Sequence, residues 1–166
     1  MNIHSSENKQ STANSQQPEL KYCYKYPHPA VTADCVIFGF DESNKIKVLL
    51  IQRGNDPYKG KWAFPGGFME IDETAEQCAR RELEEETGLK DVAVEQFYTF
   101  TDVNRDPRER IISVAHYALV KLSEVKGGDD ADDAQWFSLD EIPPLAFDHK
   151  EILNKALQTL KERKKL

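Results

Sequence analysis

Residues 64–89 read FPGGFMEIDETAEQCARRELEEETGL, and the rest of the chain is organised around this stretch. Thr74 and Gln77 have the spacing of a capping box, which predicts a helix that begins at about Ala75. Gly88 predicts the end of that helix, because glycine adopts the left-handed conformation after a helix without steric cost. The stretch therefore predicts a strand end, a glycine turn and a helix of ordinary length.

This predicted helix carries carboxylates on the side that its apolar residues assign to the core. At about 100° per residue, the apolar side holds Ala75, Cys78, Ala79 and Leu83. The opposite side holds Glu76, Gln77, Arg80, Arg81, Glu84 and Thr87. Glu82, Glu85 and Glu86 fall on the apolar side. Carboxylates that converge toward an interior repel one another and lose hydration unless a cation accompanies them.

The three converging glutamates indicate a metal site. Hard divalent cations prefer carboxylate oxygens, with waters and substrate phosphates completing the shell. Arg81 lies one turn before Glu85, so it can pair with Glu85 and fix its orientation. The alternative is an ordinary solvated helix face, but Glu76 and Glu84 already supply such a face on the other side.

The spacing of the fixed residues resembles the signature box of the Nudix hydrolases, here residues 67–89. The pattern is a glycine, five residues, a glutamate, seven residues, then Arg-Glu-apolar-x-Glu-Glu-x-Gly-apolar. It is filled by Gly67, Glu73, Arg81, Glu82, Leu83, Glu85, Glu86, Gly88 and Leu89. The resemblance implies a three-layer α/β/α sandwich with a mixed sheet, and a metal-dependent hydrolase that cleaves the pyrophosphate bond of a nucleoside diphosphate derivative.

The same resemblance implies roles for individual residues. Glu82, Glu85 and Glu86, with the backbone carbonyl of Gly66, would bind Mg²⁺, for which Mn²⁺ can substitute. The catalytic set is Glu73, Arg81, Glu82 and Glu85. Within it, Glu85 is the favoured general base, while Glu73 and Arg81 would hold the helix and the turn together.

Composition limits the class of protein. The chain has 166 residues, enough for one domain with a proper core, and a formal net charge of −7 argues against a general nucleic-acid binder. An odd number of cysteines without a C-x-x-C pair suggests reduced thiols. The sequence has no apolar run of membrane-spanning length and no signal-peptide core, so a soluble cytoplasmic protein is expected. A homodimer is also expected.

The remaining segments predict an α/β domain with about six strands and two helices. Residues 1–21 are rich in Ser, Asn, Gln and Lys and are predicted to be a disordered tail, which leaves 22–166 as the domain. The predicted strands are 31–40, 46–52, 62–64, 92–102, 111–122 and 135–139. Residues 124–133 read as an acidic loop. Asp148 and Glu151 have the form of a second capping box, before a final amphipathic helix.

Residues outside the box supply candidate substrate contacts. Arg105, Arg108 and Arg110 crowd one loop, where they either clamp phosphates or only balance their acidic neighbours. Arg53, Phe64 and Gly67 complete the predicted substrate-binding set. Aromatic residues either stack on a base or belong to the core; these are Trp62, Phe64, Tyr98 and Phe100. His116 is expected to be structural.

Two outer segments sharpen the expected substrate. TFTDVNRDPRERIISVAHYALV (residues 99–120) and LAFDHKEIL (residues 145–153) resemble the bacterial ADP-ribose pyrophosphatase branch of the Nudix family. This resemblance implies hydrolysis of ADP-ribose to AMP and ribose 5-phosphate. Two alternatives stay open: hydrolysis of 8-oxo-dGTP or another nucleoside triphosphate, and a non-catalytic sensor of ADP-ribose or a related nucleotide.

Overall fold

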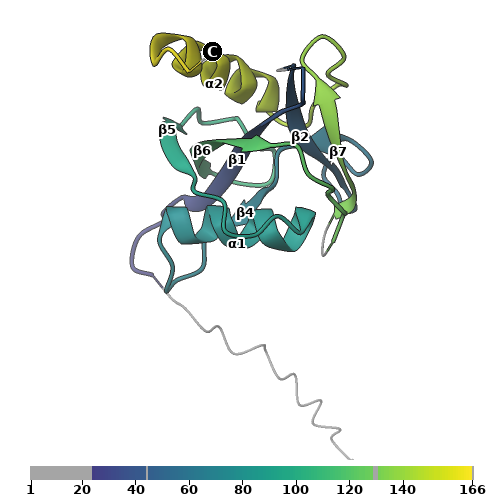
Figure 1. Cartoon of the computed structure of the whole chain (residues 1–166). Coiled ribbons are helices and arrows are strands. Elements are labelled where there is room, and N and C mark those ends of the chain that lie inside the picture. The colour runs from purple at the N-terminus through teal and green to yellow at the C-terminus, as the bar shows by residue number, and fades with distance from the viewer. Residues whose placement is uncertain (1–23, 44, 129–130, 166) are drawn as a thin grey trace, which may run out of the picture.

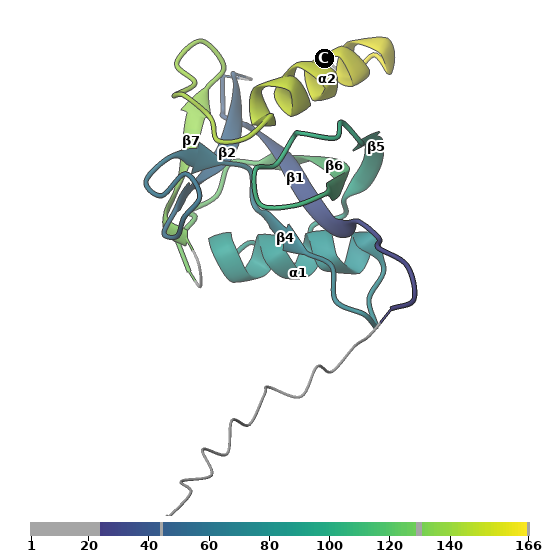
Figure 2. The same ribbon diagram turned by 180° about the vertical axis from the view of Figure 1, so that it is seen from behind.

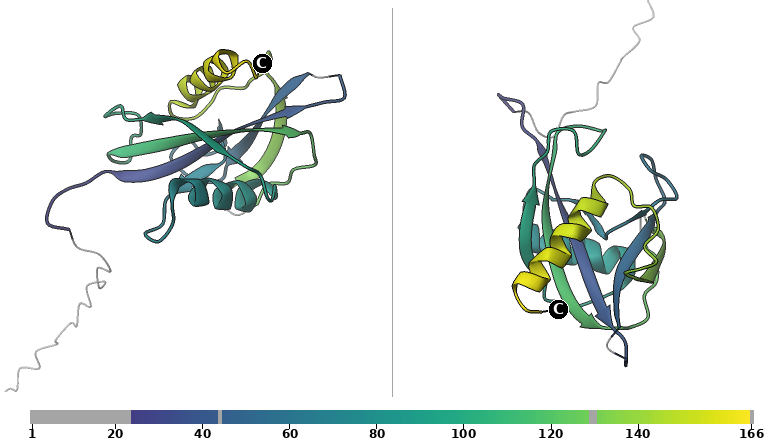
Figure 3. Two further views of the ribbon diagram at one scale, coloured as in Figure 1. Left: turned by 60° about the vertical axis from the view of Figure 1, so that its left-hand side comes forward. Right: turned by 90° about the horizontal axis from the view of Figure 1, so that it is seen from above.

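A mixed sheet lies between two helices in this computed structural model, which describes residues 24–43, 45–128 and 131–165 (Figure 1). Helix α1 (Ala75–Thr87) covers one face of the sheet and helix α2 (His149–Glu162) covers the other (Figure 3). This arrangement confirms the predicted α/β/α sandwich. The predicted tail, residues 1–21, lies outside the described residues.

The sheet is built around a parallel pair of long strands, β1 (Ala30–Phe40) and β6 (Ile111–Lys121). The other strands are β2 (Ile46–Arg53), β3 (Trp62–Ala63), β4 (Gly66–Phe68), β5 (Glu95–Phe100) and β7 (Ala131–Ser138). The main order is β3-β2-β1-β6-β5, while β4 pairs with β1 and β7 pairs with β2. All pairs other than β1–β6 are antiparallel, so the sheet is mixed.

Alternate residues of β1 contribute to two separate hydrophobic cores, because successive side chains of a strand point to opposite faces. The core on the α1 side contains Ala33, Cys35, Ile37, Cys78, Ala79 and Leu83. The core on the α2 side contains Val36, Phe38, Ile152, Ala156 and Leu160. Both helices are therefore fixed against the same strand, which holds their positions relative to each other.

Both predicted ends of α1 are confirmed. The Thr74 hydroxyl accepts the Gln77 backbone N–H at 3.3 Å, and the Gln77 side chain accepts the Thr74 backbone N–H at 2.8 Å. Gly88 has φ 75°, a left-handed conformation that costs glycine little. The prediction that Thr87 lies on the outer face is wrong. Thr87 is buried, and its hydroxyl donates to the Leu83 carbonyl at 2.5 Å.

Three strand predictions differ from the structure, and in one of them the strand predicted at 92–102 spans only Glu95–Phe100. Residues Gly66–Phe68, predicted as a turn, form strand β4, which pairs with Thr32–Asp34 of β1 (Figure 2). Strand β7 begins at Ala131, within the predicted acidic loop. Such segments are too short or too charged to carry a clear alternating pattern, so long-range pairing decides them. Among the described residues, no helix is both long enough and apolar enough to span a membrane.

Candidate active site

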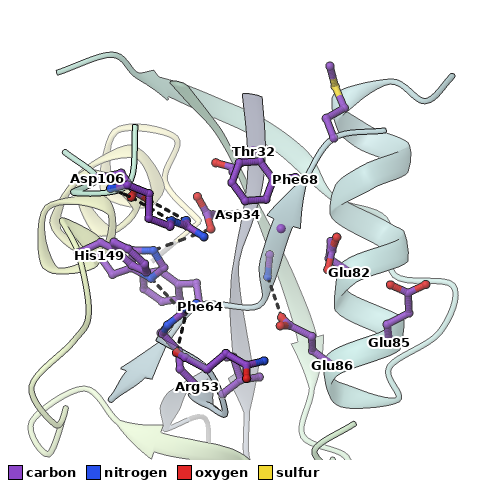
Figure 4. A pocket seen from close by; sticks show the side chains of 18 of the residues that line it. Thr32, Asp34, Arg53, Phe64, Phe68, Glu82, Glu85, Glu86, Asp106 and His149 are labelled. Carbon is purple, nitrogen blue, oxygen red and sulfur yellow. Dashed lines mark hydrogen bonds and ion pairs between the residues drawn. The ribbon is translucent and has the colours of Figure 1, made fainter. Parts of the chain in front are cut away.

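A cavity of about 490 Å³ lies between α1 and the loops that contain Asn55, Arg105 and Phe147. Figure 4 shows glutamates of α1 on one side, Asp106, His149, Phe64 and Arg53 on the other, and Asp34 between them. Most of the predicted site residues line this cavity: Arg53, Phe64, Gly66, Gly67, Arg81, Glu82, Glu85, Glu86, Arg105 and Arg108. Glu73 and Arg110 do not.

The glutamates of α1, here called the acid wall, are Glu82, Glu85 and Glu86. Glu86 is buried, Glu82 is half-buried and Glu85 is exposed at the outer end of the wall. Loss of hydration raises the pKa of Glu86 to about 8, and the charges of Glu82 and Asp34 act in the same direction. A hydrogen bond from the Gly66 backbone N–H, at 2.9 Å, partly offsets this. Burial likewise raises the pKa of Glu82.

Arg81 links the acid wall to strand β4 and to Glu73, which follows it. Its guanidinium lies 2.6 Å from Glu82 and 3.0 Å from Glu85, so the predicted pairing with Glu85 is present. It also contacts both carboxylate oxygens of Glu73, at 2.7 and 3.0 Å, and donates to the Phe68 carbonyl at 3.2 Å. The hydrogen bond from Arg81 lowers the pKa of Glu73 to about 2. Glu73 thus acts on the cavity through Arg81.

Strand β4 approaches α1 closely because Gly67 has no side chain. A Cβ atom there would lie 2.4 Å from Glu82 Oε1, well inside van der Waals contact. The carboxylate of Glu82 therefore occupies the space that any other residue at this position would need. Gly67 therefore determines how closely the acid wall can approach strand β4.

The acid wall has the chemistry to hold a hard divalent cation. Among residues 24–43, 45–128 and 131–165, no three His, Cys, Asp or Glu side chains are grouped as a closed metal site. The three carboxylates bind other donors: Arg81 binds Glu82 and Glu85, while the Gly66 N–H binds Glu86. A buried carboxylate with a raised pKa gains most from a nearby cation. The oxygen donors therefore fit a divalent ion.

Two arginines on the opposite side, Arg105 and Arg108, are already paired with carboxylates. Arg105, whose side chain is only 4% exposed, contacts both oxygens of Asp148 at 2.6 and 2.8 Å. Arg108 contacts both oxygens of Asp106 at 2.8 and 3.0 Å. Arg105 therefore balances an acidic residue 43 positions away rather than one in its own loop.

The pairing with Arg105 also explains a wrong prediction at the start of α2. Asp148 is the N-cap residue, but its side chain makes no capping hydrogen bond. Its carboxylate accepts two hydrogen bonds from Arg105 instead. A bidentate contact between two charged groups is stronger than the single hydrogen bond from a backbone N–H that the local pattern predicts.

Arg110 lies away from the cavity, at the end of the loop of residues 101–110, here called the arginine loop. Its guanidinium donates to the carbonyls of Thr101 at 2.8 Å and Asp102 at 3.1 Å. These contacts join the two ends of the loop. The structure therefore does not bring Arg110 together with the other predicted substrate contacts.

Phe147 is a cavity residue that sequence reasoning missed. The Arg53 and Arg108 guanidinium carbons lie 5.0 and 5.3 Å from the centre of its ring, within cation–π range. Arg108 also lies 5.0 Å from the ring of Phe68. Phe147 has φ 50°, an uncommon conformation for a bulky residue. The predicted aromatic residues Trp62, Tyr98 and Phe100 do not line the cavity, whereas Phe64 lines it from the core.

Asp34 and His149 are the other missed residues. Both are buried, and both line the cavity. The signal for Asp34 was a charged residue inside an apolar strand, which is costly without a partner. Its partner is Ser113, whose hydroxyl donates to Asp34 Oδ2. By contrast, His116 is buried outside the cavity with its Nδ1 3.0 Å from the Val114 carbonyl, as a structural histidine should be.

Comparison with known proteins agrees with this geometry. The NUDIX domain family matches residues 28–157. The chain is 44% identical over 135 residues to the ADP-ribose pyrophosphatase of Methanocaldococcus jannaschii, which covers 81% of this chain and 77% of that relative. It is 34% identical to the ADPR responsive transcriptional repressor NtrR of Acinetobacter baylyi, covering 83% of this chain but only 57% of the repressor.

A solved structure supports the same assignment. The NUDIX domain of Shewanella oneidensis NrtR, complexed with ADP ribose, superposes with a TM-score of 0.75 and 32% identity. The match covers 84% of this chain and 94% of that one. The family match, the identity with an ADP-ribose pyrophosphatase and the acid wall on α1 agree with one another. The chain therefore belongs to the NUDIX domain family and is a Nudix pyrophosphohydrolase.

Proposed function

We propose that this chain hydrolyses the pyrophosphate bond of ADP-ribose and releases AMP and ribose 5-phosphate. The observation that carries the proposal is the 44% identity with an ADP-ribose pyrophosphatase across most of both chains. The geometry supports it, because a wall of carboxylates faces a side rich in arginine and aromatic rings across one cavity. A substrate with a diphosphate between two sugars can place its phosphates near the acid wall and a sugar against the opposite side.

The acid wall would provide the metal ligands. Glu82, Glu85 and Glu86, with the carbonyl of Gly66, are the proposed ligands of Mg²⁺, for which Mn²⁺ can substitute. When bound, such an ion offsets charge on phosphate oxygens and lowers the pKa of a water molecule. Glu85, the exposed member of the wall, is the proposed acceptor of the water proton at its carboxylate.

The roles of Glu73 and Arg81 follow from their contacts. Arg81 holds the carboxylates of Glu82 and Glu85 at the face of the cavity, and Glu73 holds Arg81 against the turn. The guanidinium also places a positive charge between the two neighbouring carboxylates, which offsets their mutual repulsion. They position the reacting groups without contacting substrate.

The opposite side would bind the substrate. Arg53, Phe64, Gly67 and Arg108 line the cavity and are the proposed contacts for the phosphates and the sugar. Arg105 is only 4% exposed, against 34% for Arg108, and Arg110 does not line the cavity, so both would support the loop that carries Arg108. This divides the three predicted arginines into one contact and two supports.

A substrate panel tests the proposal. The purified chain is assayed with Mg²⁺ against ADP-ribose and 8-oxo-dGTP, and products are identified by chromatography. We expect a higher kcat/KM for ADP-ribose, with AMP and ribose 5-phosphate as products. Preference for the triphosphate, with release of pyrophosphate, would instead support the first alternative.

The sensor alternative has one observation in its favour. The chain is similar to a repressor that is described as responsive to ADPR. A sensor has no need of a complete acid wall, so binding of ADP-ribose without turnover is the outcome that would support it. The expected homodimer, the cytoplasmic location and the absence of nucleic-acid binding stay predictions; sedimentation of the purified chain tests the first of them.

A further inference from the structure

His149 is held in one tautomer by the backbone. The Phe64 backbone N–H points at His149 Nδ1 at a distance of 2.9 Å, and both groups are buried. A backbone N–H can only donate, so Nδ1 carries no proton and accepts. The proton of the neutral ring must therefore sit on Nε2. Burial lowers the pKa of His149, which keeps the ring neutral.

The Nε2–H donor faces a carboxylate without touching it. Nε2 lies 3.9 Å from Asp34 Oδ1, beyond the length of a direct hydrogen bond. The other oxygen of Asp34 is occupied by the Ser113 hydroxyl. Both residues line the cavity, and the side chains of His149 and Asp34 are 5% and 9% exposed, respectively. The pair thus presents one donor and one acceptor side by side (Figure 4).

The spacing of this pair selects the chemistry of its partner. A single oxygen placed about 2.8 Å from both atoms would span a gap of this width. That oxygen must accept from Nε2–H and donate to Asp34, which is the bonding pattern of a hydroxyl group. A phosphate oxygen accepts but does not donate, and the Asp34 carboxylate would repel its charge.

The position of the pair relates the hydroxyl to the rest of the substrate. Asp34 Oδ1 would lie 2.7 Å from a Cβ atom on Gly66, so the carboxylate borders the turn that faces the acid wall. In ADP-ribose, each of the two riboses is attached directly to the diphosphate. A site beside the acid wall is therefore within reach of a ribose hydroxyl.

We propose that Asp34 and His149 form a hydroxyl-binding site that recognises a ribose of the substrate, with Asp34 as acceptor and His149 Nε2–H as donor. This rests on the proposed function and specifies how the sugar is selected. The ribose is either that of the adenosine or the terminal one. Both have the same chemistry, so the experiment distinguishes them.

Two substitutions of His149 separate its two nitrogens. His149→Asn leaves an amide oxygen near the position of Nδ1, which can accept the Phe64 N–H, but it has no donor at the position of Nε2. His149→Gln reaches the position of Nε2 with an amide N–H. KM and kcat are measured for ADP-ribose and for two analogues, each lacking the 2′ and 3′ hydroxyls of one of its two riboses.

We expect His149→Asn to raise KM for ADP-ribose about tenfold, while His149→Gln stays within about threefold of the wild type. For the wild type, KM for one analogue should be higher than KM for ADP-ribose by about the same factor. For that analogue, His149→Asn and the wild type should have the same KM. That analogue identifies the ribose. In both cases kcat changes little, since the contact holds the substrate before and during the reaction.

The proposal is overturned if wild-type KM is the same for ADP-ribose and both analogues, a result that needs no variant to fold. It is also overturned if His149→Asn raises KM equally for all three compounds, because the effect would then be structural. If the wild type prefers another nucleoside diphosphate derivative, the proposed function fails alone, and the same comparison is made with the hydroxyls of that substrate.

Discussion

The two sides of the cavity are built in opposite ways. The acid wall comes from one continuous segment, in which Glu82, Glu85 and Glu86 occupy adjacent positions on a single helix. The facing side is assembled from β1, β2, the arginine loop and the start of α2, which are far apart in the sequence. Its charges are also matched in pairs, Arg105 with Asp148 and Arg108 with Asp106.

This difference separates two tasks. The acid wall holds like charges that need an added cation, so it is suited to chemistry on phosphates. On the facing side the charges of Arg105 and Arg108 are already matched, so it is suited to holding a shape that recognises the substrate. Changes to the acid wall should reduce turnover, and changes to the facing side should alter stability or KM.

The largest effect should come from removing divalent cations. Exhaustive treatment with EDTA should abolish hydrolysis, because no ion would then offset charge on the phosphate oxygens or lower the pKa of the attacking water. Activity should return with about millimolar Mg²⁺, since sites with few protein ligands bind this ion weakly. Undiminished turnover after chelation would mean that the acid wall does not work through a metal.

A substitution within the acid wall should have the next largest effect. Glu86→Gln should lower kcat about 100-fold or more, because the amide keeps the shape of the buried side chain and loses its charge. Glu84→Gln, on the exposed face of the same helix, is the matched control and should be nearly neutral. Equal losses for both variants would show that the wall is not a distinct functional unit. Steady-state kinetics and a thermal melt of each variant provide the measurements.

Breaking a pair on the facing side should destabilise the fold. Arg105→Ala leaves the Asp148 carboxylate, only 12% exposed, without its partner and should cost about 3 kcal/mol of unfolding free energy. Chemical denaturation measures this loss. The double variant Arg105→Ala/Asp148→Ala should recover part of it, because no unpaired charge remains. If the single variant were as stable as the wild type, the facing side would not depend on its charge pairing.

The smallest effect should come from a conservative change of Arg108. Arg108→Lys keeps the charge near Asp106 but loses the planar group that lies against Phe68 and Phe147. We expect KM for ADP-ribose to rise about fivefold with little change in kcat. Arg110→Lys, outside the cavity, is the control and should leave both constants unchanged. A larger effect from Arg110 would contradict the division of the three arginines.

The same contrast explains how much the sequence could predict. The helix, its two caps and the acid wall follow from local rules over a short segment, and the structure has all of them. Phe147 and His149 follow no such rule, and neither do the partners of Asp34, because the sheet brings β1, β6 and the start of α2 together across the fold. At Asp148 a local rule was misleading, since a distant arginine competes for the carboxylate. Strand β4 was missed because three residues carry no measurable periodicity.

The start of α2 has a consequence for how this chain can change in length. Three successive residues there have different tasks: Phe147 contacts Arg108, Asp148 binds Arg105, and His149 accepts from Phe64. Just before them, the Ala146 N–H donates to the Trp62 carbonyl at 2.8 Å, which ties the segment to β3. Insertions or deletions between β7 and this tie can be absorbed by the connecting loop. A single inserted or deleted residue after it would displace all three side chains at once, so homologues should vary in loop length before residue 145 and keep a fixed length from there into the helix.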